Sequence, residues 1–226
     1  MSKDRFLIKD EKPYFLLRNA YAKALEKEGL LYKKDLNDTI TIREEKSPTK
    51  HTIFIKNLDC ENTTQTVTEV WVFDLEKEQR GYKTSGKTTE CALLVFIQGE
   101  NQDKILILLP ELKTSLQTND TLSNCETKFK DSINRLYLLL LATNDRETSE
   151  NDFKNTKIAF KGIVFYQNDK INEDKETESE LFRIKTAENS KGFANVSTIL
   201  NENDKINIEF VKTTAQQTFL LKNLIF

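Results

Sequence analysis

The chain has 226 residues, of which 38% are hydrophobic and 31% are charged, and its formal net charge is -2. This length is enough for one large or two small domains with a buried core, and the dense apolar runs exclude a disordered chain. The near balance of 34 basic and 36 acidic residues excludes a uniformly basic surface, so any basic surface has to be local.

The few thiol and imidazole groups limit the sites and the compartment that the sequence predicts. Cys60, Cys91 and Cys125 form no CxxC pair, and with a single histidine, His51, they offer no plausible zinc site. An odd number of cysteines without a signal peptide predicts reduced thiols and a cytoplasmic protein. The longest apolar runs fall far short of the roughly 20 residues that span a bilayer, so no membrane partner is expected.

The N-terminal part of the chain predicts one helix followed by strands. Apolar residues recur at helical spacing from Pro13 to Glu28, proline suits the first helical turn, and Gly29 suits the stop. The next segments are expected as strands because they alternate or are rich in β-branched residues: Thr39–Arg43, Thr52–Lys56 and Thr66–Asp74. The polar run Glu76–Lys87 is expected as a connection.

The middle of the chain predicts a hairpin and then a long helix. The apolar runs Ala92–Ile97 and Ile105–Leu109 are separated by a polar turn. Leu116–Asn124 is expected as a polar linker. Cys125–Ala142 carries a wide apolar stripe at helical spacing, which predicts a helix that is buried on more than one side, for example against the sheet and a partner helix.

The C-terminal part predicts further strands and a closing helix. Lys157–Gln167 is almost continuously apolar and is expected as an interior strand. Asn168–Glu180 is expected as a flexible insertion. Two short strands and a helix are then expected: Leu181–Lys185, Lys205–Lys212 and Thr213–Phe226. This order favours a single α/β domain over 1–226, with a mixed central sheet flanked by helices.

A constellation of charged residues surrounds the hairpin. Glu90 enters its first strand, and Glu111 and Lys113 leave its second strand two residues apart. Residues two apart in a strand point to the same face, and a hairpin folds the start of its first strand beside the end of its second. Two acids and one lysine are therefore expected to meet at one end of the hairpin, where they could hold a divalent metal and a water.

An acid on one strand, E-x-K on the next and a helix directly behind resemble the PD-(D/E)xK nuclease superfamily. The resemblance covers about residues 90–141 and implies a restriction-endonuclease-like core with insertions, at about 13–166, with a C-terminal extension at about 181–226. It implies that Glu90, Glu111 and the backbone carbonyl of Leu112 bind Mg²⁺ or Mn²⁺, and that Lys113 orients the attacking water. A glutamate of the first helix often completes such a site, and Glu28 is preferred here over Glu26.

The resemblance implies a Mg²⁺-dependent endonuclease that acts on DNA, of the kind found in restriction or antiviral defence. Basic residues near the site are expected to contact phosphates without reading sequence: Lys83, Lys87, Lys128 and Lys130. The wide apolar face of residues 125–142 would allow a homodimer that cuts both strands.

Two departures from the pattern leave alternatives open. The first acid is glutamate where aspartate is commoner, and Pro110 precedes Glu111, so that strand end is an edge, a bulge or a bend. Glu111 and Lys113 could instead be an exposed ion pair of little energetic weight. The chain could also be a non-catalytic module of the same fold that binds nucleic acid or protein, or a structural protein whose likeness is accidental.

Overall fold

The computed structural model describes residues 25–44, 51–76, 86–100, 103–117, 119–141, 156–171, 179–199 and 204–226. In chain order, the strands and helices of these residues are β1 (Leu31–Lys34), β2 (Ile40–Arg43), β3 (Thr52–Lys56), β4 (Gln65–Asp74), β5 (Cys91–Gly99), β6 (Asp103–Leu116), α2 (Asn119–Leu141), β7 (Thr156–Asp169), α3 (Glu180–Thr186), β8 (Lys191–Val196), β9 (Asp204–Lys212), β10 (Gln216–Leu220) and α4 (Leu221–Ile225). The predicted α/β class and mixed sheet are confirmed.

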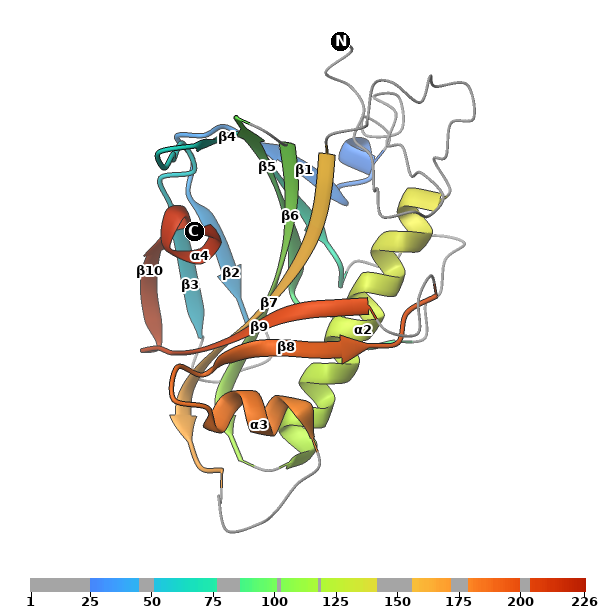
Figure 1. Cartoon of the computed structure of the whole chain (residues 1–226), viewed down its shortest axis with the longest axis vertical. Helices are drawn as coiled ribbons and strands as arrows, with labels where there is room; N and C mark the ends of the chain where they lie inside the picture. Colours follow the sequence, from blue (N-terminus) through green and yellow to red (C-terminus); the bar gives the residue numbers. More distant parts are fainter. Residues whose placement is uncertain are drawn as a thin grey trace.

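The described strands form two sheets. The larger has seven strands in the order β1-β4-β5-β6-β7-β9-β8, and the smaller has three in the order β10-β3-β2. Strands β4, β5 and β6 are antiparallel neighbours, whereas β6, β7 and β9 run parallel. Parallel neighbours need a crossover, and α2 lies in the crossover between β6 and β7 (Figure 1).

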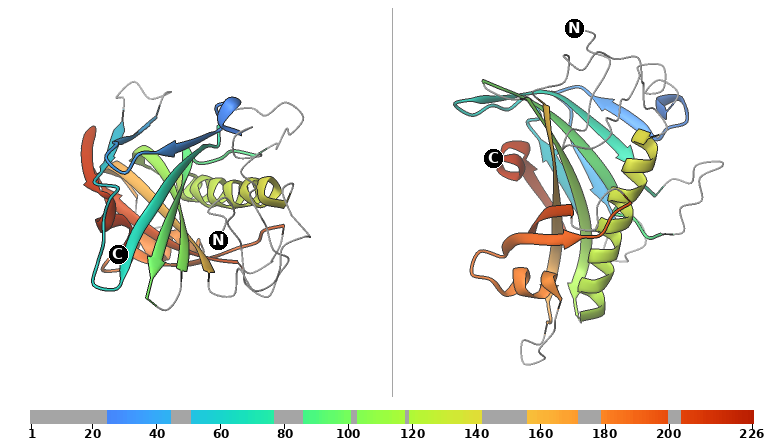
Figure 2. Two further views of the ribbon diagram at one scale, coloured as in Figure 1. Left: turned by 90° about the horizontal axis from the view of Figure 1, so that it is seen from above. Right: turned by 45° about the vertical axis from the view of Figure 1, so that its right-hand side comes forward.

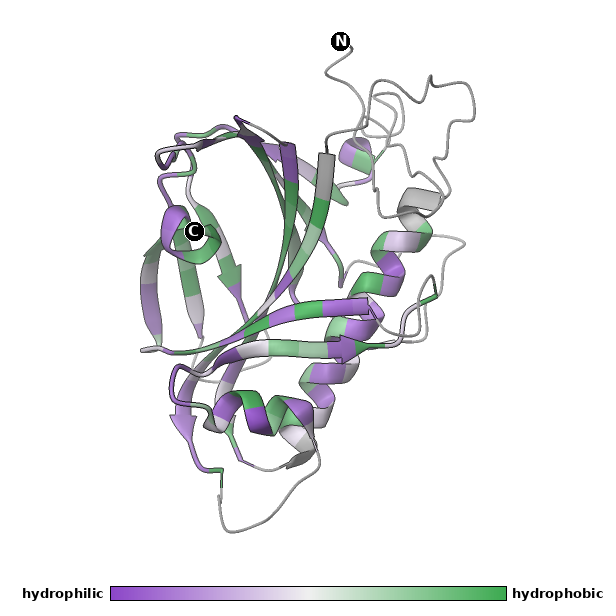
Figure 3. Ribbon diagram, viewed as in Figure 1, coloured by the Kyte–Doolittle hydropathy of each residue, from purple (hydrophilic) through white to green (hydrophobic). Residues whose placement is uncertain are grey.

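The large sheet is covered on both faces. Helices α2 and α3 lie over one face, and the small sheet with α4 lies over the other (Figures 1 and 2). Along β6, Ile107 and Leu109 belong to the buried cluster on the α2 side, while Leu106 and Leu108 belong to the cluster on the side of the small sheet. Burial on both faces explains the continuous apolar runs within β5 and β6, which are green in Figure 3.

The end of the first predicted helix agrees with the sequence. Residues 25–27 are helical, Gly29 has a φ of 66°, and its N–H donates to the Glu26 carbonyl at 2.9 Å. Glycine adopts this left-handed conformation without a Cβ penalty. The rest of the predicted helix Pro13–Glu28 lies outside the described residues.

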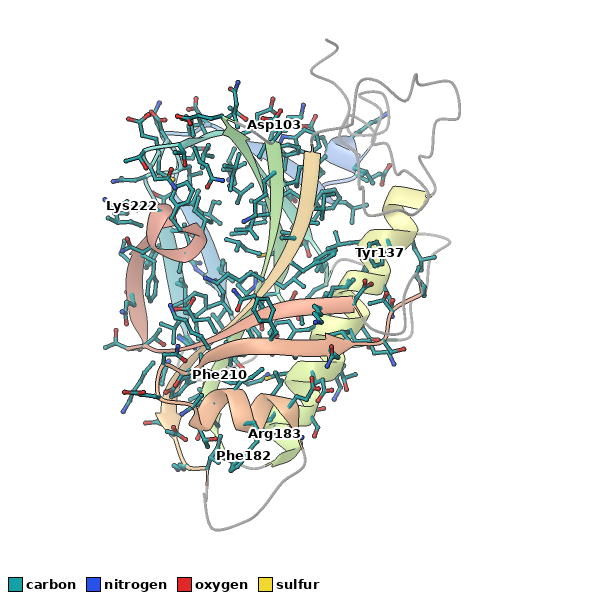
Figure 4. All side chains as sticks on the ribbon, in the orientation of Figure 1. Asp103, Tyr137, Phe182, Arg183, Phe210 and Lys222 are labelled. Carbon is teal, nitrogen blue, oxygen red and sulfur yellow. The ribbon has the colours of Figure 1, made fainter. Side chains whose placement is uncertain are left out.

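Helix α2 is longer than predicted, and its apolar stripe is used within the chain. It begins at Asn119, so the prediction of a linker up to Asn124 was wrong. Phe129 packs so closely on β7 that a Cβ at Gly162 would lie 2.9 Å from its ring. Tyr137 of α2 and Phe210 of β9, both labelled in Figure 4, are buried in the layer between helix and sheet. No helix of the described residues is long and apolar enough to cross a membrane.

Two C-terminal predictions were wrong. The segment expected as the strand Leu181–Lys185 is helix α3, because Leu181 and Ile184, three residues apart, are both buried. Thr213–Phe226 was expected as a helix, but Gln216–Leu220 forms β10 and only Leu221–Ile225 is helical. Strand β10 pairs in parallel with β3, a partner about 160 residues away that local periodicity does not reveal. The predicted strand Lys205–Lys212 is confirmed as β9.

Candidate active site

The β5–β6 hairpin brings Glu90 beside Glu111. The strands pair Leu93 with Leu108, and the same register, continued toward the site, sets Glu90 opposite Glu111. The backbone N–H of Leu112 donates a hydrogen bond to Glu90 Oε2 at 3.2 Å. The proximity expected from the hairpin is therefore confirmed.

Pro110 lies within strand β6 rather than at its end. The β6–β7 ladder continues through Pro110 to Leu116, whereas the ladder between β5 and β6 ends at Leu108. Proline has no N–H to donate, so β6 presents a local edge toward β5 beyond this point. The backbone N–H of Leu112 lies on that edge and donates the hydrogen bond to Glu90. A local edge at Pro110 is one of the three geometries that the sequence predicted.

Two lysines surround the carboxylate of Glu111. Glu111 is fully buried and, like Lys113, points to the α2 side of β6. Its Oε1 forms an ion pair with the ammonium of Lys113. The ammonium of Lys128, from α2, lies 2.7 Å from Glu111 Oε1, 3.0 Å from Glu111 Oε2 and 3.7 Å from Glu90 Oε1. Lys128 was expected on a phosphate-binding surface, but only 15% of its side chain is exposed, and it lies between the two acids.

Burial and charge shift the pKa values of this cluster. Burial, and then the neighbouring carboxylate of Glu111, raises the pKa of Glu90 well above its ordinary value, against the lowering effect of Lys128. Burial alone would lower the pKa of Lys113 and of Lys128, but the charges of Glu111 and Glu90 and the hydrogen bonds to Glu111 together outweigh it, and both pKa values are raised. The two ammonium groups therefore stay protonated at neutral pH.

Helix α2 also fixes the segment that leads into Glu90. The backbone N–H of Thr89 donates to Ser132 Oγ at 2.9 Å, and Thr89 Oγ1 donates to the carbonyl of Cys91 at 3.0 Å. One turn along, the guanidinium of Arg135 donates to the carbonyl of Leu75. These contacts were not predicted. Their signal in the sequence is the pair of polar residues, Ser132 and Arg135, within the apolar stripe of α2.

The remaining predicted site residues are outside this buried cluster. Glu28 is exposed in the turn before β1, and β1 is separated from β6 by two strands. Lys87 and Lys130 are exposed, and Lys83 lies outside the described residues. Within the described part of the chain, no group of three or more His, Cys, Asp or Glu side chains is placed to bind a metal. The hairpin therefore contributes two carboxylates and no third acid.

Glu90 and Glu111 are close enough to share one cation. One oxygen of each lies within 3.7 Å of the Lys128 ammonium, which both acids contact. The two carboxylates can bind a cation, and the ammonium groups of Lys113 and Lys128 can attract an anion. Comparison with known proteins gives no matching family model, no matching curated protein and no matching solved structure.

Proposed function

We propose that this protein is a Mg²⁺-dependent nuclease that hydrolyses phosphodiester bonds in DNA, with its site at the β5–β6 hairpin. The observation that supports the proposal best is the shared cation position: Glu90, directly before β5, and Glu111 of β6 both contact the ammonium of Lys128. An ammonium bound between two carboxylates marks a position that favours a cation. Lys113, on the same face as Glu111, adds a fixed positive charge next to that position.

The chemistry of the donors fits Mg²⁺ or Mn²⁺. Both ions prefer oxygen ligands, and Mg²⁺ usually keeps several waters and binds one or two carboxylates. In a β-strand the N–H and C=O of one residue point to the same edge. Since the N–H of Leu112 points to Glu90, its carbonyl faces the same side and is available as a third ligand. Waters and the substrate would complete the coordination.

The residues of the cluster then have distinct roles. Glu90 and Glu111 would hold the metal, which would supply a hydroxide near neutral pH and neutralise charge on the phosphate. Lys113 orients the attacking water and stabilises negative charge as it develops in the transition state. Its ion pair with Glu111 fixes the ammonium at the metal side of the strand. The segment held by Ser132 keeps Glu90 in place.

The surface around the cluster supports contact with a polyanion. Lys87 precedes the Glu90 segment and Lys130 lies two residues beyond Lys128 on α2, and both are exposed. Contacts of this kind bind phosphates without reading bases. The order of acid, E-x-K strand and helix supports a restriction-endonuclease-like core, and a role in restriction or antiviral defence follows from that resemblance alone.

The direct test is cleavage of supercoiled plasmid by the purified protein with Mg²⁺. The wild type should nick or linearise the plasmid, and EDTA should stop the reaction. Glu111→Gln and Lys113→Ala should each lose about 100-fold or more in rate. The matched control is Glu209→Gln, because Glu209 of β9 is also buried and also pairs with two lysines, Lys161 of β7 and Lys191 of β8. Cleavage by both site variants at the wild-type rate would refute the assignment.

The second candidate is a non-catalytic module of the same fold that binds nucleic acid or a partner protein. One observation favours it: the ammonium groups of Lys113 and Lys128 already form ion pairs with the two acids. Titration calorimetry with Mn²⁺ separates the two candidates. Binding that is lost in Glu90→Ala excludes the module, whereas a folded wild type that binds no Mn²⁺ and cuts no plasmid excludes the nuclease.

A further inference from the structure

Lys128 is the one residue of the cluster that contacts both acids. Its ammonium lies 2.7 and 3.0 Å from the two oxygens of Glu111 and 3.7 Å from Glu90 Oε1. Lys113 instead pairs with Glu111 from its own strand. The position of Lys128 Nζ is therefore the point at which oxygens of Glu90, directly before β5, and of Glu111 in β6 converge, and a metal held by both acids would compete for it.

The geometry of Glu90 agrees with a site that presents one oxygen to a cation. Its Oε2 is held by the N–H of Leu112 at 3.2 Å, which leaves Oε1 directed to Lys128. A carboxylate anchored at one oxygen keeps its direction when the cation changes. Lys128 itself reaches the site from a neighbouring helix on a long side chain with four rotatable carbon–carbon bonds, so its ammonium can move away without a change in the backbone.

The ion-pair cluster around Glu209, on the other face of the sheet, can be compared with the cluster around Lys128. Glu209 pairs with Lys161 at 2.7 Å and with Lys191 at 2.8 Å, so one acid has two lysines. At the hairpin, two lysines form ion pairs with two acids, and both acids are nearly or fully buried. Buried carboxylates this close repel each other unless a cation separates them. At the hairpin that cation is the ammonium of Lys128.

We propose that the ammonium of Lys128 is a built-in competitor that occupies the metal position in the metal-free protein and has to be displaced before Mg²⁺ or Mn²⁺ can bind. This inference rests on the proposed metal-dependent function. The competitor holds the carboxylates of Glu90 and Glu111 around one position. It also lowers the apparent affinity for metal, because only the fraction of molecules with the ammonium displaced can bind.

The test is Mn²⁺ titration calorimetry on the full chain without DNA. Lys128→Met keeps the apolar stem and removes the charge, and it should bind Mn²⁺ at least about tenfold more tightly than the wild type. Lys128→Arg keeps a cation in place and should bind no more tightly than the wild type. Lys161→Met removes a lysine that is paired in the same way with Glu209, and it should bind Mn²⁺ as the wild type does. Circular dichroism shows that each variant is folded.

The outcomes separate this inference from the proposed function. Tighter binding by Lys128→Met alone supports competition. Equal or weaker binding by Lys128→Met, with binding retained in the wild type, overturns the competitor role and leaves the metal site in place. Equal tightening in Lys128→Arg and Lys128→Met also overturns it, because the effect would then be steric. A failure of the wild type and of every folded variant to bind Mn²⁺ overturns the metal-dependent function itself.

Discussion

The backbone N–H of Leu112 holds Glu90 by a hydrogen bond of 3.2 Å across the end of the β5–β6 hairpin. The contact exists because the ladder between the two strands ends at Leu108 and frees the edge of β6 beyond Pro110. The proline that departs from the expected pattern is thus next to the backbone group that orients the first acid. A carboxylate held in this way is positioned for a cation and is also costly to bury.

The cost of burying Glu90 in its charged form predicts that Glu90→Gln and Glu209→Gln change the melting temperature in opposite directions. Burial and Glu111 raise the pKa of Glu90, so its charged form is disfavoured in the fold. Burial acts in the same direction on Glu209, but the hydrogen bonds and charges of Lys161 and Lys191 lower its pKa overall. In EDTA, Glu90→Gln should raise the melting temperature and Glu209→Gln should lower it. Each kcal/mol of change in the free energy of unfolding should shift the melting temperature by about 2–4 °C. Scanning calorimetry measures both, and a fall for Glu90→Gln would contradict the prediction.

Ser132 is predicted to position Glu90 without touching the substrate. Its hydroxyl accepts from the N–H of Thr89 at 2.9 Å, so Ser132→Ala leaves a buried donor unpaired and should cost about 1–3 kcal/mol. It should also weaken Mn²⁺ binding, because the segment before Glu90 is released. Ser123→Ala changes an exposed serine of the same helix and is the control. Urea unfolding and calorimetry measure the two effects, and unchanged metal affinity in a destabilised Ser132→Ala would show a structural role only.

Gly162 is predicted to be required by the packing of α2 on β7. A Cβ at this position would lie 2.9 Å from the ring of Phe129 and 2.7 Å from Ile208 Cδ1. Gly162→Ala should therefore destabilise the fold by about 1–3 kcal/mol. Ile208→Val removes the nearer atom, so the double variant should lose less than the sum of the single variants. Strict additivity in urea unfolding would show that Ile208 is not the source of the clash.

His51 is predicted to make stability depend on pH. It is buried with Nε2 at 2.9 Å from Thr213 Oγ1, and burial lowers its pKa below 6.5. The unfolded state then binds more protons below about pH 6.5, so this contribution is full above that pH and is lost as the pH falls. Urea unfolding at about pH 7.5 and at about pH 5.5 should show a smaller loss for His51→Gln than for the wild type. Equal losses would mean that other groups cause the dependence.

Much of the sheet was predictable because its signals are local. Strands β2, β3, β4, β5 and β7 lie where alternation or continuous apolar character predicted them. The closing segment was not predictable in this way, since β10 forms by pairing with β3 and its sequence has no strong strand pattern of its own. The short helix α3 was mistaken for a strand because a run of seven residues contains only two buried positions, Leu181 and Ile184, from which to read a period.

The residues of the site also divide into those that the sequence predicts and those that only the tertiary structure places. The sequence by itself determined that Glu90, Glu111 and Lys113 meet, because a hairpin and a period of two fix which residues share one end and one face. Only the tertiary structure decided that Lys128 lies between the two acids and that Ser132 holds the segment before Glu90. The rotation and height of a helix over a sheet depend on how side chains such as Phe129 and Gly162 interlock, and that packing is non-local.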